Sequence, residues 1–284
     1  MIKFKAGDIF TFQLPTKEFM CGRIMLDVNQ QCIRPGLLKP NSPLNFFDGS
    51  LLVEIYKSTF SEPAANRSEL LIPGVFVGST FLESGQWSIT GHEEVDPREV
   101  AFPESLAARG GGAQFVKGEI ALDIELQTEE LERLGVYSTK KPSGILGEIC
   151  LYYLGRAEEI NNPRLRDIEL RSLKDSDLRF TAYRSKIYHL LGEDESQSYY
   201  EMSARLGYDI GRFYPAILCP YCLSSVDENV KLCPTCGEDT TRDAFVEMHP
   251  EEYLNKERKA CCFCGNSMLK LASVCPACRR WQDR

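Results

Sequence analysis

Apolar and polar residues alternate with a period of two in several segments of the first half of the chain. The alternation is clearest over residues 10–14, 22–28, 51–56 and 118–124. Strands that bury one face of a sheet have this period, because successive side chains point to opposite faces. Residues that end or reverse strands separate these segments, namely Pro15, Pro35-Gly36, Asn41-Ser42-Pro43 and Asp48-Gly49. We therefore expect a mostly β domain over residues 1–126.

Beyond about Thr128 the apolar residues recur every three or four positions, which is the spacing of a helix that buries one side. Thr128 is a suitable N-cap for a first short helix, and Gly135 and Gly192 are suitable helix ends. The expected helices cover residues 129–134, 145–153, 165–173, 180–191 and 195–213. Pro215 ends the last of them, so the pattern predicts a helical region over residues 127–215.

Four Cys-x-x-Cys pairs follow the helical region. Ten residues separate the first two pairs, ten separate the last two, and the second set repeats the first after 42 residues. Two residues between cysteines let both thiolates face one ion, and two such turns complete a tetrahedral zinc site. The expected ligands are Cys219, Cys222, Cys233, Cys236, Cys261, Cys264, Cys275 and Cys278. Four thiolates leave no open coordination position, so we expect two structural rather than catalytic zinc ions, within residues 216–284.

These cysteine modules resemble the double zinc-ribbon family over residues 219–278. The resemblance implies the fold but not the function, because zinc ribbons bind nucleic acid, proteins or lipids, or support a neighbouring domain. Cys219-Pro-Tyr-Cys222 also has the four residues of a glutaredoxin active site, but a second pair ten residues later favours metal over redox chemistry. Cys262 lies outside the expected zinc shell, and His249 is a remote alternative ligand.

Charge is distributed unevenly around these modules. The formal net charge is −8, which argues against a protein that coats nucleic acid as a whole. Residues 256–284, however, contain seven bases and two acids. Their candidate phosphate-binding residues are Lys256, Arg258, Lys259, Lys270, Arg279 and Arg280, with Phe263 or Trp281 available for stacking. Docking of this basic module on an acidic protein surface is an equally open alternative.

Several short motifs near the N-terminus occur in a recognisable order. They are Lys5 to Pro15, Phe19 to Ile24, Ser84 to Gly91, and Pro103. Together they resemble the immunity protein 26 family of bacterial polymorphic-toxin systems over about residues 4–105, although Pro15-Thr16-Lys17-Glu18 stands where the family has a glycine in the first turn. The resemblance implies a non-enzymatic protein that binds and neutralises a protein toxin. An acidic chain is suited to cover the basic substrate face of a nuclease toxin.

The sequence contains no recognisable catalytic motif. The chain has only three histidines, scattered without a common motif, and Arg109 to Gly112 lacks the Gly-Lys-Ser/Thr ending of a phosphate loop. The carboxylates Glu93, Glu94 and Asp96 near His92 are interpreted as a polar turn.

The sequence thus predicts an α+β multidomain protein in the cytoplasm, with two zinc ions as cofactors and no catalytic residues. We expect no membrane segment, because no apolar run approaches the roughly 18 residues needed to span a bilayer. The expected partner is a protein such as a cognate toxin, and a nucleic-acid-associated regulatory or defence role is the alternative.

Overall fold

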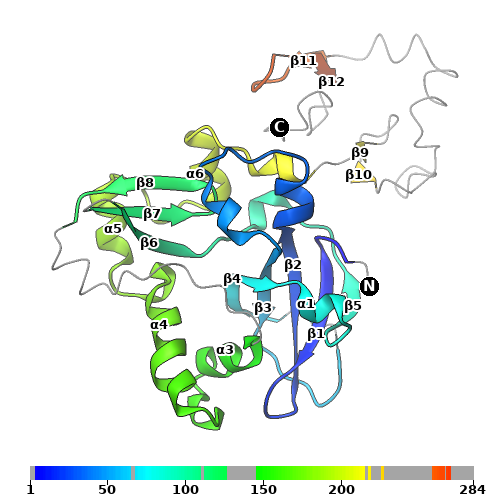
Figure 1. The fold of residues 1–284 in the computed structure, drawn as a ribbon. Helices are drawn as coiled ribbons and strands as arrows, with labels where there is room; N and C mark the ends of the chain where they lie inside the picture. The colour runs from blue at the N-terminus through cyan, green and yellow to red at the C-terminus, as the bar shows by residue number, and fades with distance from the viewer. Residues whose placement is uncertain are drawn as a thin grey trace, which may run out of the picture. The chain divides into compact units, whose positions relative to one another are not determined.

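The computed structural model describes residues 4–64, 68–109, 112–126, 145–214, 217–218, 225–226, 258–265 and 267–269. The chain divides into two compact units, a first unit of Met1–Tyr208 and a second unit of Asp209–Arg284. Figure 1 shows the elements of both units.

A five-stranded antiparallel sheet forms one half of the first unit (Figure 1). Its strands are β1 (Asp8–Gln13), β2 (Phe19–Asp27), β3 (Ser50–Tyr56), β4 (Leu70–Gly78) and β5 (Ser88–His92), in the order β4-β3-β2-β1-β5. The three strands expected from alternation over residues 10–14, 22–28 and 51–56 are confirmed as β1, β2 and β3. Their register pairs Phe10 with Gly22 and Ile24 with Val53, which brings the apolar set to one face.

The second sheet of the first unit has three antiparallel strands. They are β6 (Glu104–Arg109), β7 (Gly112–Lys117) and β8 (Ile120–Ile124). Arg109 and Gly112, which begin and end the segment considered for a phosphate loop, pair with each other at the end of the β6–β7 hairpin. The strand expected from Gly118 begins only at Ile120, because Gly118 has φ +61° and turns the chain.

Among the described residues, all the α-helices except α1 (Thr80–Glu83) follow the two sheets, as expected. The others are α3 (Leu146–Tyr153), α4 (Leu170–Asp175), α5 (Arg184–Leu191) and α6 (Tyr199–Arg205). Shorter 3₁₀ or π-helical turns are Val28–Ile33, Pro43–Phe47, Pro97–Glu99, Ala157–Glu159, Leu165–Glu169, Leu178–Phe180 and Ile210–Phe213. The expected helices over 145–153 and 165–173 are confirmed, whereas the one expected over 129–134 lies outside the described residues.

Two of the expected helices had wrong boundaries. The helix expected over 180–191 begins at Arg184, because Asp177 caps a separate 3₁₀ turn before it. The long helix expected over 195–213 is wrong. In its place α6 starts after Ser198, whose capping box fixes the first turn, and ends before Gly207, which has φ +76°.

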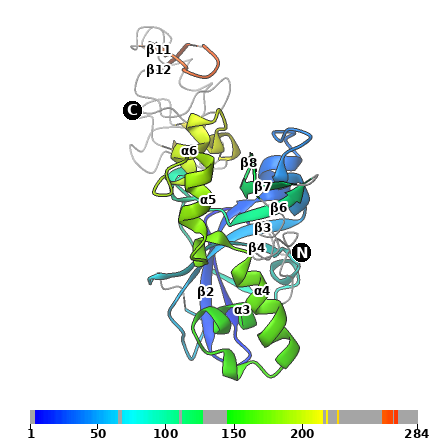
Figure 2. The ribbon, with the colours of Figure 1, turned by 90° about the vertical axis from the view of Figure 1, so that its left-hand side faces the viewer.

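The helices α3 and α4 complete the core of the first sheet, and Figure 2 shows them alongside its strands. Leu146, Ile149 and Leu170 belong to the same buried cluster as Phe10 and Val53. Burial of such side chains contributes about 1.5–3 kcal/mol each. The five-stranded sheet and the helices α3 and α4 therefore share one core in the first unit.

Short strands are described in the second unit. Strand β9 (Ile217–Leu218) pairs with β10 (Ser225–Val226), and β11 (Arg258–Ala260) pairs with β12 (Ser267–Leu269). Among the residues described in either unit, no helix is long and apolar enough to cross a membrane.

Candidate functional site

A buried arginine organises the face of the first sheet that lies opposite the main core. Arg23 pairs with Glu54 across β2 and β3, and both side chains leave the sheet on this face. Arg23 Nε donates a 2.8 Å hydrogen bond to Glu54 Oε1, which also accepts a 2.5 Å bond from the Tyr56 hydroxyl. Arg23 is only 1% exposed and Glu54 only 3%. Because a buried charge without a counter-charge is costly, each residue stabilises the charged form of the other.

The same guanidinium reaches carboxylates at the surface. Arg23 Nη2 donates a 2.8 Å hydrogen bond to Glu99, and Nη1 lies 3.6 Å from a Glu93 carboxylate oxygen. The Glu93 and Glu99 side chains are 42% and 47% exposed. Burial opposes the charge on Arg23, but Glu99 and Glu54 outweigh it and raise the pKa of Arg23 above its ordinary value. A buried cation therefore orients two exposed anionic groups.

His92 and its acidic neighbours belong to this part of the structure. His92 Nδ1 lies 2.8 Å from Asp8 Oδ1, and the Asp96 side chain accepts from the backbone N–H of Arg98 at 2.9 Å. The first contact ties the end of β5 to β1, and the second is a local contact within the turn. They are hydrogen bonds and ion pairs of the kind that hold a polar turn in place.

Sequence reasoning did not identify Arg23 and Glu54 as a pair. The two residues are 31 positions apart, and Glu99 is 76 positions from Arg23. The available signal was a charged residue in the middle of each of two largely apolar strands.

A second buried charge network joins the three-stranded sheet to α5. Glu104 accepts hydrogen bonds from Arg184 Nε at 2.7 Å and from the Tyr188 hydroxyl at 2.8 Å, and Lys117 Nζ lies 3.0 Å away. Burial opposes the ionisation of Glu104, but Arg184 and Lys117 outweigh it and hold the pKa of Glu104 below its ordinary value. This network fixes the helix on the sheet.

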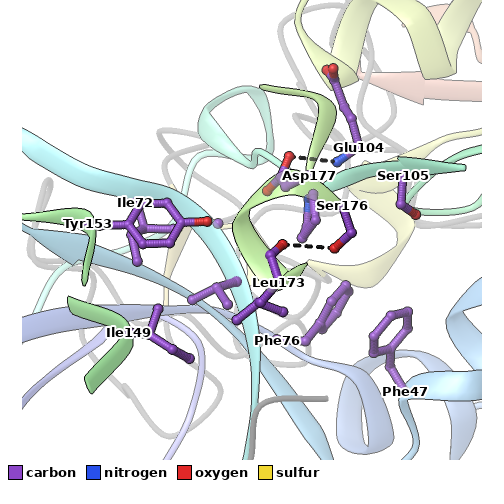
Figure 3. A pocket seen from close by; sticks show the side chains of 13 residues that line it. Phe47, Ile72, Phe76, Glu104, Ser105, Ile149, Tyr153, Leu173, Ser176 and Asp177 are labelled. Atoms are coloured by element: carbon purple, nitrogen blue, oxygen red, sulfur yellow. Dashed lines mark hydrogen bonds between the residues drawn. The ribbon is translucent and has the colours of Figure 1, made fainter. Parts of the chain in front are cut away.

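A small cavity lies where the two sheets meet α3 and α4 (Figure 3). Its volume is about 60 Å³, and its lining includes Phe76, Ile149 and Tyr153. Small-molecule sites are usually about 300–1,000 Å³, so this space has room for only about two water molecules. Figure 3 shows Asp177 beside it, accepting a 3.4 Å hydrogen bond from the Glu104 N–H. The cavity is a packing defect between the two sheets and the helices α3 and α4, and it is too small to be a ligand site.

The expected zinc ligands are only partly within the described residues. Cys261 and Cys264 lie in the connection between β11 and β12, while the other six cysteines lie outside the described residues. The Phe263 N–H donates to Cys261 Sγ at 3.4 Å, the Gly265 N–H donates to the Cys261 carbonyl at 2.9 Å, and Gly265 has φ +70°. A tight turn with an N–H directed at sulfur favours a thiolate ligand.

The strand pairs around the cysteines repeat with the sequence. Leu218 pairs with Ser225, and 42 residues later Ala260 pairs with Ser267. Ile217 with Val226 and Lys259 with Met268 follow the same offset. Each first cysteine pair thus stands between two strands of the same register, as a repeated module requires.

No group of three or more His, Cys, Asp or Glu side chains that could hold a metal lies among the residues that the structure describes. Because six of the eight expected cysteines are outside those residues, the zinc sites remain predictions. Of the basic residues considered for phosphate binding, Arg258 and Lys259 lie on β11. Lys256, Lys270, Arg279 and Arg280 lie outside the described residues, as do His249 and Trp281. Phe263 is 39% exposed.

Comparison with known proteins gives one result, and it concerns the first unit. No curated protein and no solved structure matches the chain. The family model of immunity protein 26 matches residues 5–109, which contain the whole five-stranded sheet, the Arg23 network and strand β6.

Proposed function

We propose that this protein is a non-enzymatic bacterial immunity protein that binds and neutralises a protein toxin. The observation that carries the proposal is the match of residues 5–109 to the immunity protein 26 family. That segment contains all five strands of the first sheet. The match to the family therefore covers a whole sheet rather than a short motif.

Electrostatics support a basic partner. The formal net charge is −8, and Glu93 and Glu99 are exposed carboxylates whose positions are set by the buried Arg23. Carboxylates that are already oriented lose less conformational entropy when they pair with a partner. A toxin that acts on an anionic substrate, such as nucleic acid, has a basic face that an acidic protein can cover.

We also propose that the second unit binds two structural zinc ions, each held by four cysteines, as a support or a second docking site. The repeated register of the β9–β10 and β11–β12 pairs and the turn at Cys261 favour this proposal. When bound, zinc would supply folding free energy to a module with little apolar core.

The test of function is affinity purification of the tagged full-length protein from its native cells. Mass spectrometry would identify bound proteins, and the ratio of absorbance at two wavelengths would reveal bound nucleic acid. We expect a stoichiometric protein with toxin-like domains, and co-expression of that protein with this chain should restore growth. Recovery of nucleic acid alone, lost at high salt and on neutralising Lys256, Arg258, Arg279 and Arg280, would contradict the proposal and favour the basic ribbon face.

A further inference from the structure

A polar groove lies on the outer face of the three-stranded sheet in the first unit. Its volume is about 430 Å³, which is within the usual range of binding sites. The register places Ala107, Gln114 and Asp123 in one row across β6, β7 and β8, and Ala121 lies two residues from Asp123 on the same face. The two alanines have small side chains and leave the floor of the groove open. None of the residues that form the Arg23 or Glu104 networks lines this groove.

Polar side chains from three separate segments surround this floor. The lining is completed by Lys39, Asn41, Ser42, Pro43, Glu119 and Tyr208. Gln114 Nε2 donates a 3.0 Å hydrogen bond to Asp123 Oδ1, which orients the carboxylate while leaving it exposed. Lys39 Nζ lies 5.2 Å from the centre of the Tyr208 ring.

The charges in the groove favour a cation. Among the residues that line it, Asp123 is an exposed carboxylate, Glu119 is a carboxylate that is only 2% exposed, and Lys39 is the single ammonium group. An excess of negative charge in a concave surface raises the local concentration of cations. Lys39 also shows that the face of the Tyr208 ring is accessible to a cation, since its own ammonium lies over that ring.

We infer that this groove receives an arginine side chain from the protein partner. A guanidinium is planar and can pair with the Asp123 carboxylate through two hydrogen bonds while lying against the Tyr208 ring. Lys39 is exposed, so its side chain can move aside when the arginine enters. The inference rests on the proposed function, because it assigns a second contact to the same partner, outside the acidic groups near Arg23.

The experiment compares the affinity of the full-length protein and its variants for the purified toxin partner. Asp123→Asn keeps the shape and the acceptor for Gln114 but removes the charge, and we expect about tenfold weaker binding, equal to about 1.4 kcal/mol. Ala121→Trp fills the groove without changing charge and should weaken binding at least as much. Asp175→Asn is the matched control, because this exposed carboxylate on α4 does not line the groove and should leave affinity unchanged.

Thermal unfolding of each variant shows whether it is folded. Affinity unchanged in both folded Asp123→Asn and folded Ala121→Trp would overturn the inference while leaving the proposed function intact, as would an equal loss in Asp175→Asn.

A separate measurement tests the groove if the wild-type protein binds no toxin. Nuclear magnetic resonance titration with N-acetylarginine amide should shift signals of Gln114 and Tyr208 saturably in the wild type, with a dissociation constant on the order of millimolar. The same titration of Asp123→Asn should give a weaker response. Identical titrations would overturn the inference independently of the proposed function.

Discussion

Arg184 Nε donates a 2.7 Å hydrogen bond to the carboxylate of Glu104, although the two residues are 80 positions apart. Glu104 lies within the segment that matches the immunity protein 26 family, whereas Arg184 lies on α5, beyond it. The core shows the same dependence, since Leu146 and Ile149 on α3 pack with Phe10 of the first strand. The matched segment is therefore completed by residues that the match does not include.

Replacing Glu104 by glutamine should destabilise the first unit. Glu104 is 1% exposed, and its loss as an anion leaves Lys117 buried without a full counter-charge. Removing one partner from a buried ion network typically costs about 3–5 kcal/mol. We expect the free energy of unfolding from urea denaturation to fall by about 3 kcal/mol in Glu104→Gln. Glu158→Gln, at an exposed position, should lower it by less than about 0.5 kcal/mol, and equal effects would contradict the role assigned to Glu104.

Acid should weaken the fold through Glu18 as well as Glu104. The hydrogen bond from Arg156 lowers the pKa of Glu18 from 4.5 to about 2. A folded pKa below the unfolded one means that the unfolded state binds more protons between these values, so stability rises with pH there. The stabilisation is complete above about pH 4.5 and is lost as the pH falls towards 2.

Urea denaturation at a series of pH values measures this dependence. We expect Glu18→Gln to have a shallower slope of unfolding free energy against pH between about 2 and 4.5 than the wild type. Because the Glu18 side chain is 34% exposed, the loss at neutral pH should remain below about 1 kcal/mol. Glu158→Gln serves again as the control, and a slope in Glu18→Gln that equals the wild-type slope would exclude this ion pair as the cause.

The strands that the sequence predicts best are those in which apolar and polar residues alternate without a turn sequence between them. β1, β2 and β3 are buried along nearly their whole length, and their alternation was visible because the buried polar residues Thr11, Arg23 and Glu54 point to the face opposite the main core. β4 was missed because Pro73-Gly74 is a typical turn sequence, yet it lies inside the strand next to an irregularity in register. A Cβ on Gly74 would lie 1.9 Å from the Ala101 carbonyl oxygen, so glycine is required there by a contact that only the folded chain contains.

In the helical part, the sequence pattern predicted the presence of helices better than their ends. Apolar spacing over 195–213 suggested one helix, but Gly207 reverses the chain with φ +76° and separates α6 from the turn at Ile210–Phe213. Local caps outweighed periodicity in this segment. The Arg23 network was equally hidden, because its partners come from β3 and from the turn at Pro97–Glu99.

Gly74→Ala should therefore cost much more than an ordinary glycine substitution. The added methyl group meets backbone at Ala101 rather than a flexible side chain, and Arg179 Nη2 holds the Gly74 carbonyl through a 2.6 Å hydrogen bond. Relief of the clash must displace β4, for which about 3 kcal/mol of unfolding free energy is expected.

Gly155→Ala gives the comparison for this substitution. Gly155 has φ +77°, but a methyl group on its Cα would meet no atom within 4 Å, so only backbone strain of about 1 kcal/mol is expected. Chemical denaturation of both variants measures the difference. Equal destabilisation would show that the approach of Ala101 does not restrict position 74.

The adjacent cysteines Cys261 and Cys262 allow the zinc assignment to be tested within one turn. Cys261 accepts the N–H of Phe263, and Cys264 follows at the spacing of a ligand pair, whereas Cys262 would leave a single residue between ligands. We expect about two zinc ions per chain in the wild type and in Cys262→Ser, and about one in Cys264→Ser and Cys233→Ser.

Metal analysis of the purified full-length variants by mass spectrometry measures this content directly. Thermal unfolding of the first unit should be unchanged in all of them, because its described core contains none of the expected ligands. Loss of one zinc ion in Cys262→Ser would make Cys262 a ligand, and two tightly bound ions in Cys264→Ser would remove Cys264 from the ligand set. Two ions in Cys233→Ser would instead show that the first module does not bind metal through the proposed four cysteines.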